Sequence, residues 1–136
     1  MLKRMQHLMR EGKSFAFETT CAGGNHARTL EQCRAQGYEV IVDFLWLPSA
    51  EMAIQRVAQR VAKGGHAIPE KTIRRRYIKG LQNLDKIYLP LADCVTIYDN
   101  SDNMQGGTLK MIAEKKKSKE LAIYDAAIWK LIEETV

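Results

Sequence analysis

The sequence of 136 residues is poor in cysteine and histidine, and neither type is arranged as a metal site or a disulfide framework requires. Cys21, Cys33 and Cys94 are odd in number and form no CxxC pair, which argues against structural zinc and against disulfides. No apolar run approaches the roughly 20 residues that cross a bilayer. The first ten residues lack the apolar stretch of a signal peptide. We therefore expect a cytoplasmic protein without a metal site.

The composition is that of an ordinary globular domain. Hydrophobic residues make up 46% and charged residues 27%, and a chain of this length can bury a core without disulfides or structural metal ions. The formal net charge of +5 permits acidic ligands, such as nucleotides or nucleic acid, but does not choose among them. We find no internal repeat and no linker, so we expect one domain over residues 1–136.

The stretch from Ser49 to Tyr77 predicts two basic helices joined by a Gly-Gly-His elbow. Ser49 is a suitable N-cap, and Gly64 and Gly65 end the first helix because glycine enters left-handed conformations at little cost. Pro69 suits the start of the second helix. We expect this pair of helices, over about residues 49–89, to form a lid that ends before Pro90.

Arginines are concentrated on both of these helices. Arg56, Arg60 and Lys63 fall at i, i+4 and i+7 and so share one face, while Arg74, Arg75 and Arg76 spread around the second helix. Guanidinium groups bind phosphate through two parallel hydrogen bonds, so the pair could close over a polyanion. The alternative is that these residues form ordinary solvated helix faces.

Strand patterns alternate with the helices. Residues 39–47 are rich in β-branched and aromatic side chains, which predicts a strand buried on both faces. Asn25 is a candidate cap for the helix that follows it. The other expected elements are helices over 1–11, 25–36 and 126–134, and strands over 14–20, 93–99, 108–114 and 120–124, the last two forming a small C-terminal hairpin.

Helices between strands imply crossover connections and a mostly parallel sheet of the α/β class. Ligands of such sheets lie beyond the carboxyl ends of the strands. The residues that this rule places at one edge are Glu18, Thr19, Thr20, Asn100 and Ser101.

Three segments, SFAFETT, DFLWLPSAEMAIQRVAQRVAKGGHAIPEKTIRRRY and IYDNS, resemble the zeta-toxin-like P-loop kinases, in the branch with an FETT strand and a GGHxIPE elbow. The resemblance covers nearly the whole chain. It implies a three-layer P-loop kinase fold with ATP and Mg as cofactors, and it makes the arginine hairpin the lid over ATP.

The resemblance also implies roles for individual residues. The lid arginines Arg56, Arg60 and Arg74 to Arg76 become candidates to contact the phosphates and to stabilise charge in the transition state. Asn100 and Ser101 would lie near adenine, and His66 in the elbow could touch phosphate. In zeta toxins an acid-x-Thr-x-Arg motif binds the sugar-nucleotide substrate. Glu18 and Thr20 match that motif, but Ala22 stands at the arginine position, so the substrate is not fixed.

One part of the family pattern has no match in these residues. The phosphate loop GxxxxGK[ST] and the catalytic aspartate that follows it are not found here. The sequence therefore predicts an ATP-binding phosphotransferase-like domain that is catalytically incomplete by itself. The alternatives are a non-catalytic kinase-like module that binds a partner or regulates, and a nucleic-acid binder. We do not favour the nucleic-acid binder, because aromatics are not interleaved with the basic residues.

In this fold the first strand lies between the strands that correspond to residues 14–20 and 39–47. Without it, both strands have unpaired amides, and such edges recruit partners. Three outcomes follow: the two strands pair directly, two copies associate, or a separate polypeptide supplies the strand. We expect a re-paired sheet or an oligomer, with a nucleotide or phosphorylated small molecule as ligand and no membrane partner.

Overall fold

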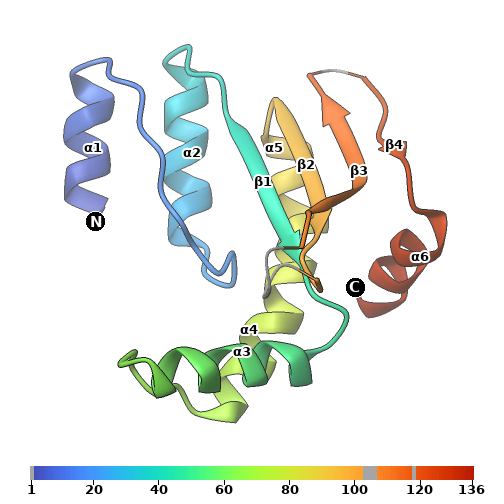
Figure 1. The fold of residues 1–136 in the computed structure, drawn as a ribbon. Helices are drawn as coiled ribbons and strands as arrows, with labels where there is room; N and C mark the ends of the chain where they lie inside the picture. The colour runs from blue at the N-terminus through green and yellow to red at the C-terminus, as the bar shows by residue number, and fades with distance from the viewer. Residues whose placement is uncertain (1, 103–106, 118) are drawn as a thin grey trace.

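The computed structural model describes residues 2–102, 107–117 and 119–136, and its centre is one sheet (Figure 1). The strands lie in the order β1-β2-β3-β4. The β1–β2 pair is parallel, and the other two pairs are antiparallel. The expectation of a mostly parallel sheet is therefore wrong for the described residues. The strands are β1 (Ile41–Trp46), β2 (Cys94–Asp99), β3 (Lys110–Lys116) and β4 (Ala122–Ile123).

The helices follow the sequence pattern closely. They are α1 (Leu2–Arg10), α2 (Asn25–Ala35), α3 (Ala50–Ala62), α4 (Glu70–Asn83), the π-helical η1 (Leu84–Tyr88), α5 (Leu89–Leu91) and α6 (Ala126–Thr135). The helical run continues through Pro90, so the prediction that it ends before this residue is wrong. Pro90 directly follows the π-helical η1, and both features interrupt the regular i→i−4 hydrogen bonds of a helix at the same place. Within the described residues, no helix is long and apolar enough to cross a membrane.

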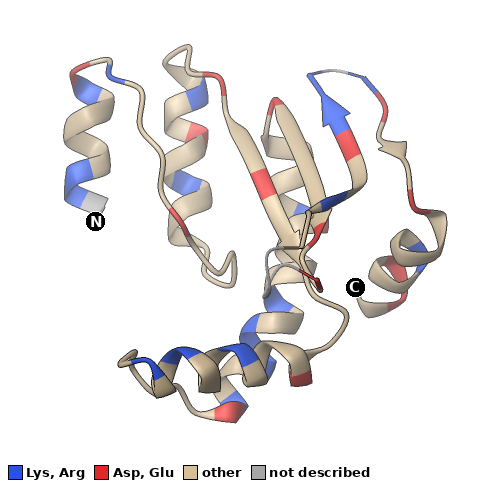
Figure 2. Ribbon diagram, in the orientation of Figure 1, with Lys and Arg blue, Asp and Glu red and all other residues tan. Residues whose placement is uncertain are grey.

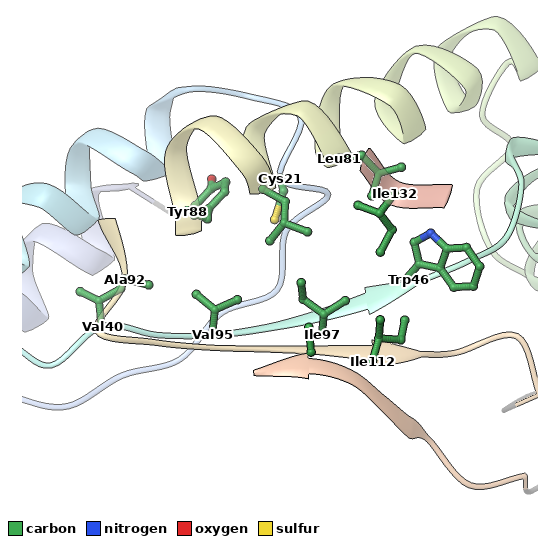
Figure 3. Close-up of a cluster of buried hydrophobic side chains, with 12 residues drawn as sticks. Cys21, Val40, Trp46, Leu81, Tyr88, Ala92, Val95, Ile97, Ile112 and Ile132 are labelled. Atoms are coloured by element: carbon green, nitrogen blue, oxygen red, sulfur yellow. The ribbon is translucent and has the colours of Figure 1, made fainter. Parts of the chain in front are cut away.

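The core lies between the sheet and the α4–η1 run. Figure 3 shows Leu81 and Tyr88 facing Val95 and Ile97 of β2. Val95 and Ile97 are fully buried. Each side chain of this size contributes about 2 kcal/mol by leaving water, so the cluster fixes the lid's second helix on the sheet.

The opposite face of β1 is open, which corrects the prediction of burial on both faces. Ile41 is 61% exposed and Leu45 is 49% exposed, whereas Trp46 on the helix side is 4% exposed. Side chains of a strand alternate between its faces, so helix packing on one face leaves the odd-numbered residues of β1 in solvent. The described elements cover one face of the sheet, and the expected three-layer arrangement is not observed.

Residues 14–20, which we call the extended segment, form no strand in the structure, and the prediction of a strand there is wrong. Among the described residues, no backbone hydrogen bond joins this segment to β1, so the first of the three possible outcomes, direct pairing of the two strands, is not observed. The residue that follows the segment, Cys21, has a left-handed φ of 61°. Asn83 of α4 holds that end, because its Nδ2 donates to the Cys21 carbonyl oxygen at 2.7 Å.

The caps of the lid helices agree with the sequence, and the cap of α2 does not. Ser49 Oγ accepts a hydrogen bond from the Met52 N–H at 3.2 Å, as expected for an N-cap. Gly64 has φ of 100°, which ends α3 in the left-handed region. Asn25 is the first residue of α2 rather than its cap; Gly24 holds that position without a side-chain bond.

Candidate functional site

A pocket of about 480 Å³ lies between the lid helices α3 and α4 and the carboxyl ends of β1 and β2. Its volume is in the range of small-molecule sites. The residues that line the pocket come from four parts of the chain. They are Thr20 at the end of the extended segment, Trp46 and Leu47 at the end of β1, the two lid helices, and Asn100 after β2. The carboxyl edge expected from the sequence is therefore the edge at which the pocket lies.

Arg56 joins the lid to the end of β2. Its Nη2 donates to the carbonyl oxygens of Asn100 at 2.6 Å and of Ser101 at 3.0 Å. Its Nε is buried and has no hydrogen-bond partner among the described residues. A buried charged donor without a partner costs free energy, so this group favours an acceptor from a ligand or an ordered water.

Three further cations line the same pocket. They are Arg60 of α3, Lys63 at the C-cap of α3 and Arg76 of α4, and no aspartate or glutamate is among the described residues of the lining. Figure 2 shows the basic residues of α3 and α4 along the hairpin. A cleft lined by one sign of charge concentrates ions of the opposite sign, so this pocket attracts anions.

The floor of the pocket is apolar, and the segments that form it approach each other closely. Trp46 and Ile73 lie in it, and the Tyr77 hydroxyl donates to the Leu47 carbonyl oxygen at 2.7 Å. Gly80 lets α4 approach the extended segment, since a Cβ at this position would lie 2.8 Å from the Thr20 carbonyl oxygen. The pocket thus combines a cationic rim with an apolar floor, which suits a ligand with one anionic and one uncharged part.

The structure brings together part of the residue set expected from the sequence. Arg56, Arg60, Arg76, Thr20 and Asn100 line the pocket, and Ser101 supplies a carbonyl oxygen to Arg56.

Arg74, Arg75, His66 and Glu18 do not line this pocket. Arg74 Nη1 lies 2.5 Å from Glu51 Oε1, and this hydrogen bond holds the pKa of Glu51 below its usual value. Arg75 and His66 are exposed. Glu18 lines a different cavity, beside β1.

Sequence reasoning did not assign site roles to Lys63, Tyr77, Gly80 or Asn83. Lys63 continues the spacing of Arg56 and Arg60, so its helical position was a usable signal. A glycine inside a helix also signals a close approach. The contact of Gly80 with Thr20, sixty positions earlier, is visible only in three dimensions.

The residues of the pocket suit an anion better than a metal ion. The unpartnered Arg56 Nε and the cationic rim suit phosphate oxygens. Mg²⁺ is bound through carboxylates, and the described lining contains none. Across the described part of the chain, no group of three His, Cys, Asp or Glu residues could hold a metal. The expected magnesium therefore has no protein ligands in this pocket, and we derive no step through it.

A family model described as Zeta toxin matches residues 1–121 of the chain. The matched range contains α1 to β3, and with them the lid hairpin and every residue of the pocket lining. No curated protein and no solved structure matches the chain in the corresponding searches.

Proposed function

The chain belongs to the zeta toxin family, and on that premise we propose that its lid pocket binds the phosphates of a nucleoside triphosphate as part of a kinase-like phosphotransferase domain. The family is related to the P-loop kinases, which supports a kinase-like domain. One observation carries the proposal. Three arginines expected to contact phosphate, on two different helices, line one pocket together with the residue that follows β2.

The chemistry of phosphoryl transfer suits such a pocket. Charge spreads over the oxygens of the transferred group, and positioning and electrostatic stabilisation supply most of the catalysis. Arg60 and Arg76 approach from α3 and α4, so they would grip the phosphates from both lid helices. Arg56 is held by its bonds to Asn100 and Ser101, which keeps its charge in place without a ligand.

The proposal assigns the remaining expected residues to separate tasks. Thr20 and Glu18 would face the phosphoryl acceptor, since Thr20 lines both the lid pocket and the neighbouring cavity that contains Glu18. Asn100 would lie beside the nucleoside. Arg74 and Arg75 are not given a phosphate contact, because Arg74 is paired with Glu51 and Arg75 lies outside the lining.

These 136 residues contain no GxxxxGK[ST] phosphate loop, so we propose that the isolated chain binds a nucleotide weakly and transfers no phosphoryl group by itself. The second candidate is a non-catalytic module that binds a partner. The free edge of β1 favours it, because an unpaired strand recruits another chain.

Calorimetric titration of the chain with ATP, and separately with adenosine, tests the proposal. We expect saturable binding of ATP with a dissociation constant of about 1 mM, which corresponds to a total binding free energy of about 4 kcal/mol. Adenosine at the same concentrations is expected to bind much more weakly. Equal binding of the two ligands, or no heat with ATP at several millimolar, would contradict a phosphate-binding pocket.

A further inference from the structure

We propose that Arg56 and Asn100 together bind the ribose hydroxyls of the nucleotide, so that the lid pocket selects ribonucleotides over nucleotides that lack these hydroxyls. This inference rests on the proposed function, because it concerns the sugar of the same ligand. The contact is separate from the phosphate contacts, for which Arg60, Lys63 and Arg76 line the same pocket.

The first argument is a pair of buried polar atoms without hydrogen-bond partners among the described residues. They are the donor Arg56 Nε and the acceptor Asn100 Oδ1, and both residues line the lid pocket. The two residues contact each other directly, because Arg56 Nη2 donates to the Asn100 backbone oxygen at 2.6 Å. Nε and Nη2 are bonded to the same carbon of the guanidinium group, so the unpaired donor and the unpaired acceptor belong to one corner of the pocket. Buried polar groups are rarely left unpaired, so this corner favours a ligand that pairs both.

The second argument is that other contacts hold both residues in place before a ligand binds. The Asn100 N–H donates to the carbonyl oxygen of Trp46, at the end of β1, at 2.9 Å. Arg56 Nη2 also donates to the Ser101 carbonyl oxygen, at 3.0 Å. These bonds occupy the backbone of Asn100 and one nitrogen of the guanidinium group, and they leave Asn100 Oδ1 and Arg56 Nε for a ligand. Groups that are positioned in advance lose little entropy on binding.

The third argument is the chemistry that this pair of atoms selects. A phosphate oxygen would satisfy Arg56 Nε, but it would place a second acceptor beside Asn100 Oδ1. The amino group of a base would satisfy Asn100 Oδ1 and leave Arg56 Nε unpaired. A hydroxyl donates one hydrogen bond and accepts others, so it can satisfy both atoms at once. It also reproduces the two bonds that an ordered water would make there, and a group that does so displaces water without losing affinity.

The ribose is the part of a nucleoside triphosphate that supplies such a group. It carries two neighbouring hydroxyls, so one of them can serve both atoms or each can serve one. It is also joined directly to the phosphates, in the same way that Arg56 and Asn100 share the pocket with the cationic rim. The edge of adenine is the other part of the ligand that presents a donor beside an acceptor, and the test therefore includes a ligand in which this edge is changed.

The test is a set of NMR titrations of the isotopically labelled chain with ATP, dideoxy-ATP and inosine triphosphate. Dideoxy-ATP lacks both ribose hydroxyls, whereas inosine triphosphate keeps them and carries an oxygen in place of the adenine amino group. We expect dideoxy-ATP to bind at least about fivefold more weakly than ATP, because the buried donor and acceptor stay unpaired. Inosine triphosphate is expected to bind within about twofold of ATP.

The outcomes separate this inference from the proposed function. Equal binding of ATP and dideoxy-ATP would overturn the ribose contact and leave the phosphate pocket intact. A loss of affinity with inosine triphosphate but not with dideoxy-ATP would assign the two atoms to the base and overturn the proposal. Absence of shifts with ATP would contradict the proposed function, and this inference with it.

Two amide-to-alanine changes provide a matched pair of protein variants. Asn100→Ala removes the unpaired acceptor and keeps the backbone oxygen that binds Arg56, and Gln55→Ala removes an exposed amide of α3 outside the pocket lining. We expect Asn100→Ala to reduce the preference for ATP over dideoxy-ATP to less than about twofold, and Gln55→Ala to keep the preference of the parent chain. The readout is a ratio of two affinities of one variant, so a change in stability alone does not move it. An unchanged preference in Asn100→Ala would overturn the assignment.

Discussion

Arg56 ties the first lid helix to the end of β2, because its Nη2 lies 2.6 Å from the carbonyl oxygen of Asn100. The second bond, to Ser101 at 3.0 Å, makes this contact a two-point anchor. The same side chain borders the proposed phosphate site, so one residue links lid position to ligand binding.

We expect Arg56→Ala to lower the free energy of unfolding by about 1–2 kcal/mol, since hydrogen bonds from a charged group to partly buried acceptors are lost. Arg60→Ala is the matched control. The Arg60 side chain borders the same pocket and makes no hydrogen bond in the described structure, so its loss is expected to change stability by less than about 0.5 kcal/mol. Urea denaturation measures both values, and equal effects would contradict the anchor.

Gly80 offers a test in which local and tertiary effects have opposite signs. Helix propensity alone predicts that Gly80→Ala stabilises α4 by about 1 kcal/mol. The new Cβ would lie 2.8 Å from the backbone oxygen of Thr20, so we expect destabilisation by about 1–3 kcal/mol instead. Gly23→Ala, where the added Cβ meets nothing within 4 Å, is expected to be nearly neutral. A stabilised Gly80→Ala variant in thermal unfolding would show that α4 and Thr20 are farther apart than described.

Asn83 is a buried amide whose Nδ2 donates to the Cys21 carbonyl oxygen at 2.7 Å. We expect Asn83→Ala to cost about 1–3 kcal/mol, because the carbonyl loses its partner inside the protein. Hydrogen exchange should also rise in residues 19–22, which this bond holds near α4. Unchanged exchange in this stretch would mean that the bond does not position it.

Burial raises the pKa of the Cys21 thiol from 9.0 to about 11. The folded state therefore holds this proton more tightly than the unfolded state. Its contribution to stability is fully present below pH 9 and is lost as the pH rises toward 11. Tyr88 and Tyr77 add in the same direction, because burial raises the pKa of both hydroxyls. Denaturation between pH 8 and 11 should show a shallower decline for Cys21→Ala than for the parent chain, and parallel curves would contradict this assignment.

The sequence predicted the elements whose signals are local. The Ser49 cap and the Gly64 termination of α3 both depend on residues within a few positions of each other, and the structure confirms them. The sequence also predicted that the lid arginines and Asn100 lie at the same edge of the sheet, because parallel strands share a carboxyl edge.

The errors concern contacts that depend on distant residues. Residues 14–20 have a strand pattern but no neighbour that pairs with them, and pairing rather than composition makes a strand. The open face of β1 depends on which helices cover the sheet, which the pattern of residues 39–47 does not contain. Arg74 is bonded to Glu51 and so is not among the arginines that line the pocket. Glu51 lies 23 positions away from Arg74, on the other lid helix.

The central claim is that the lid pocket binds phosphate through particular arginines, and neighbouring residues of α4 test it most directly. Arg76 borders the pocket, whereas Arg75 is exposed outside it, so Arg76→Ala and Arg75→Ala remove the same charge from adjacent positions. By calorimetric titration with ATP, we expect Arg76→Ala to weaken binding about three- to tenfold, as the loss of a charge-assisted hydrogen bond does at a partly exposed site. Arg75→Ala is expected to bind ATP within twofold of the parent chain, and equal losses from the two variants would contradict the pocket as the phosphate site.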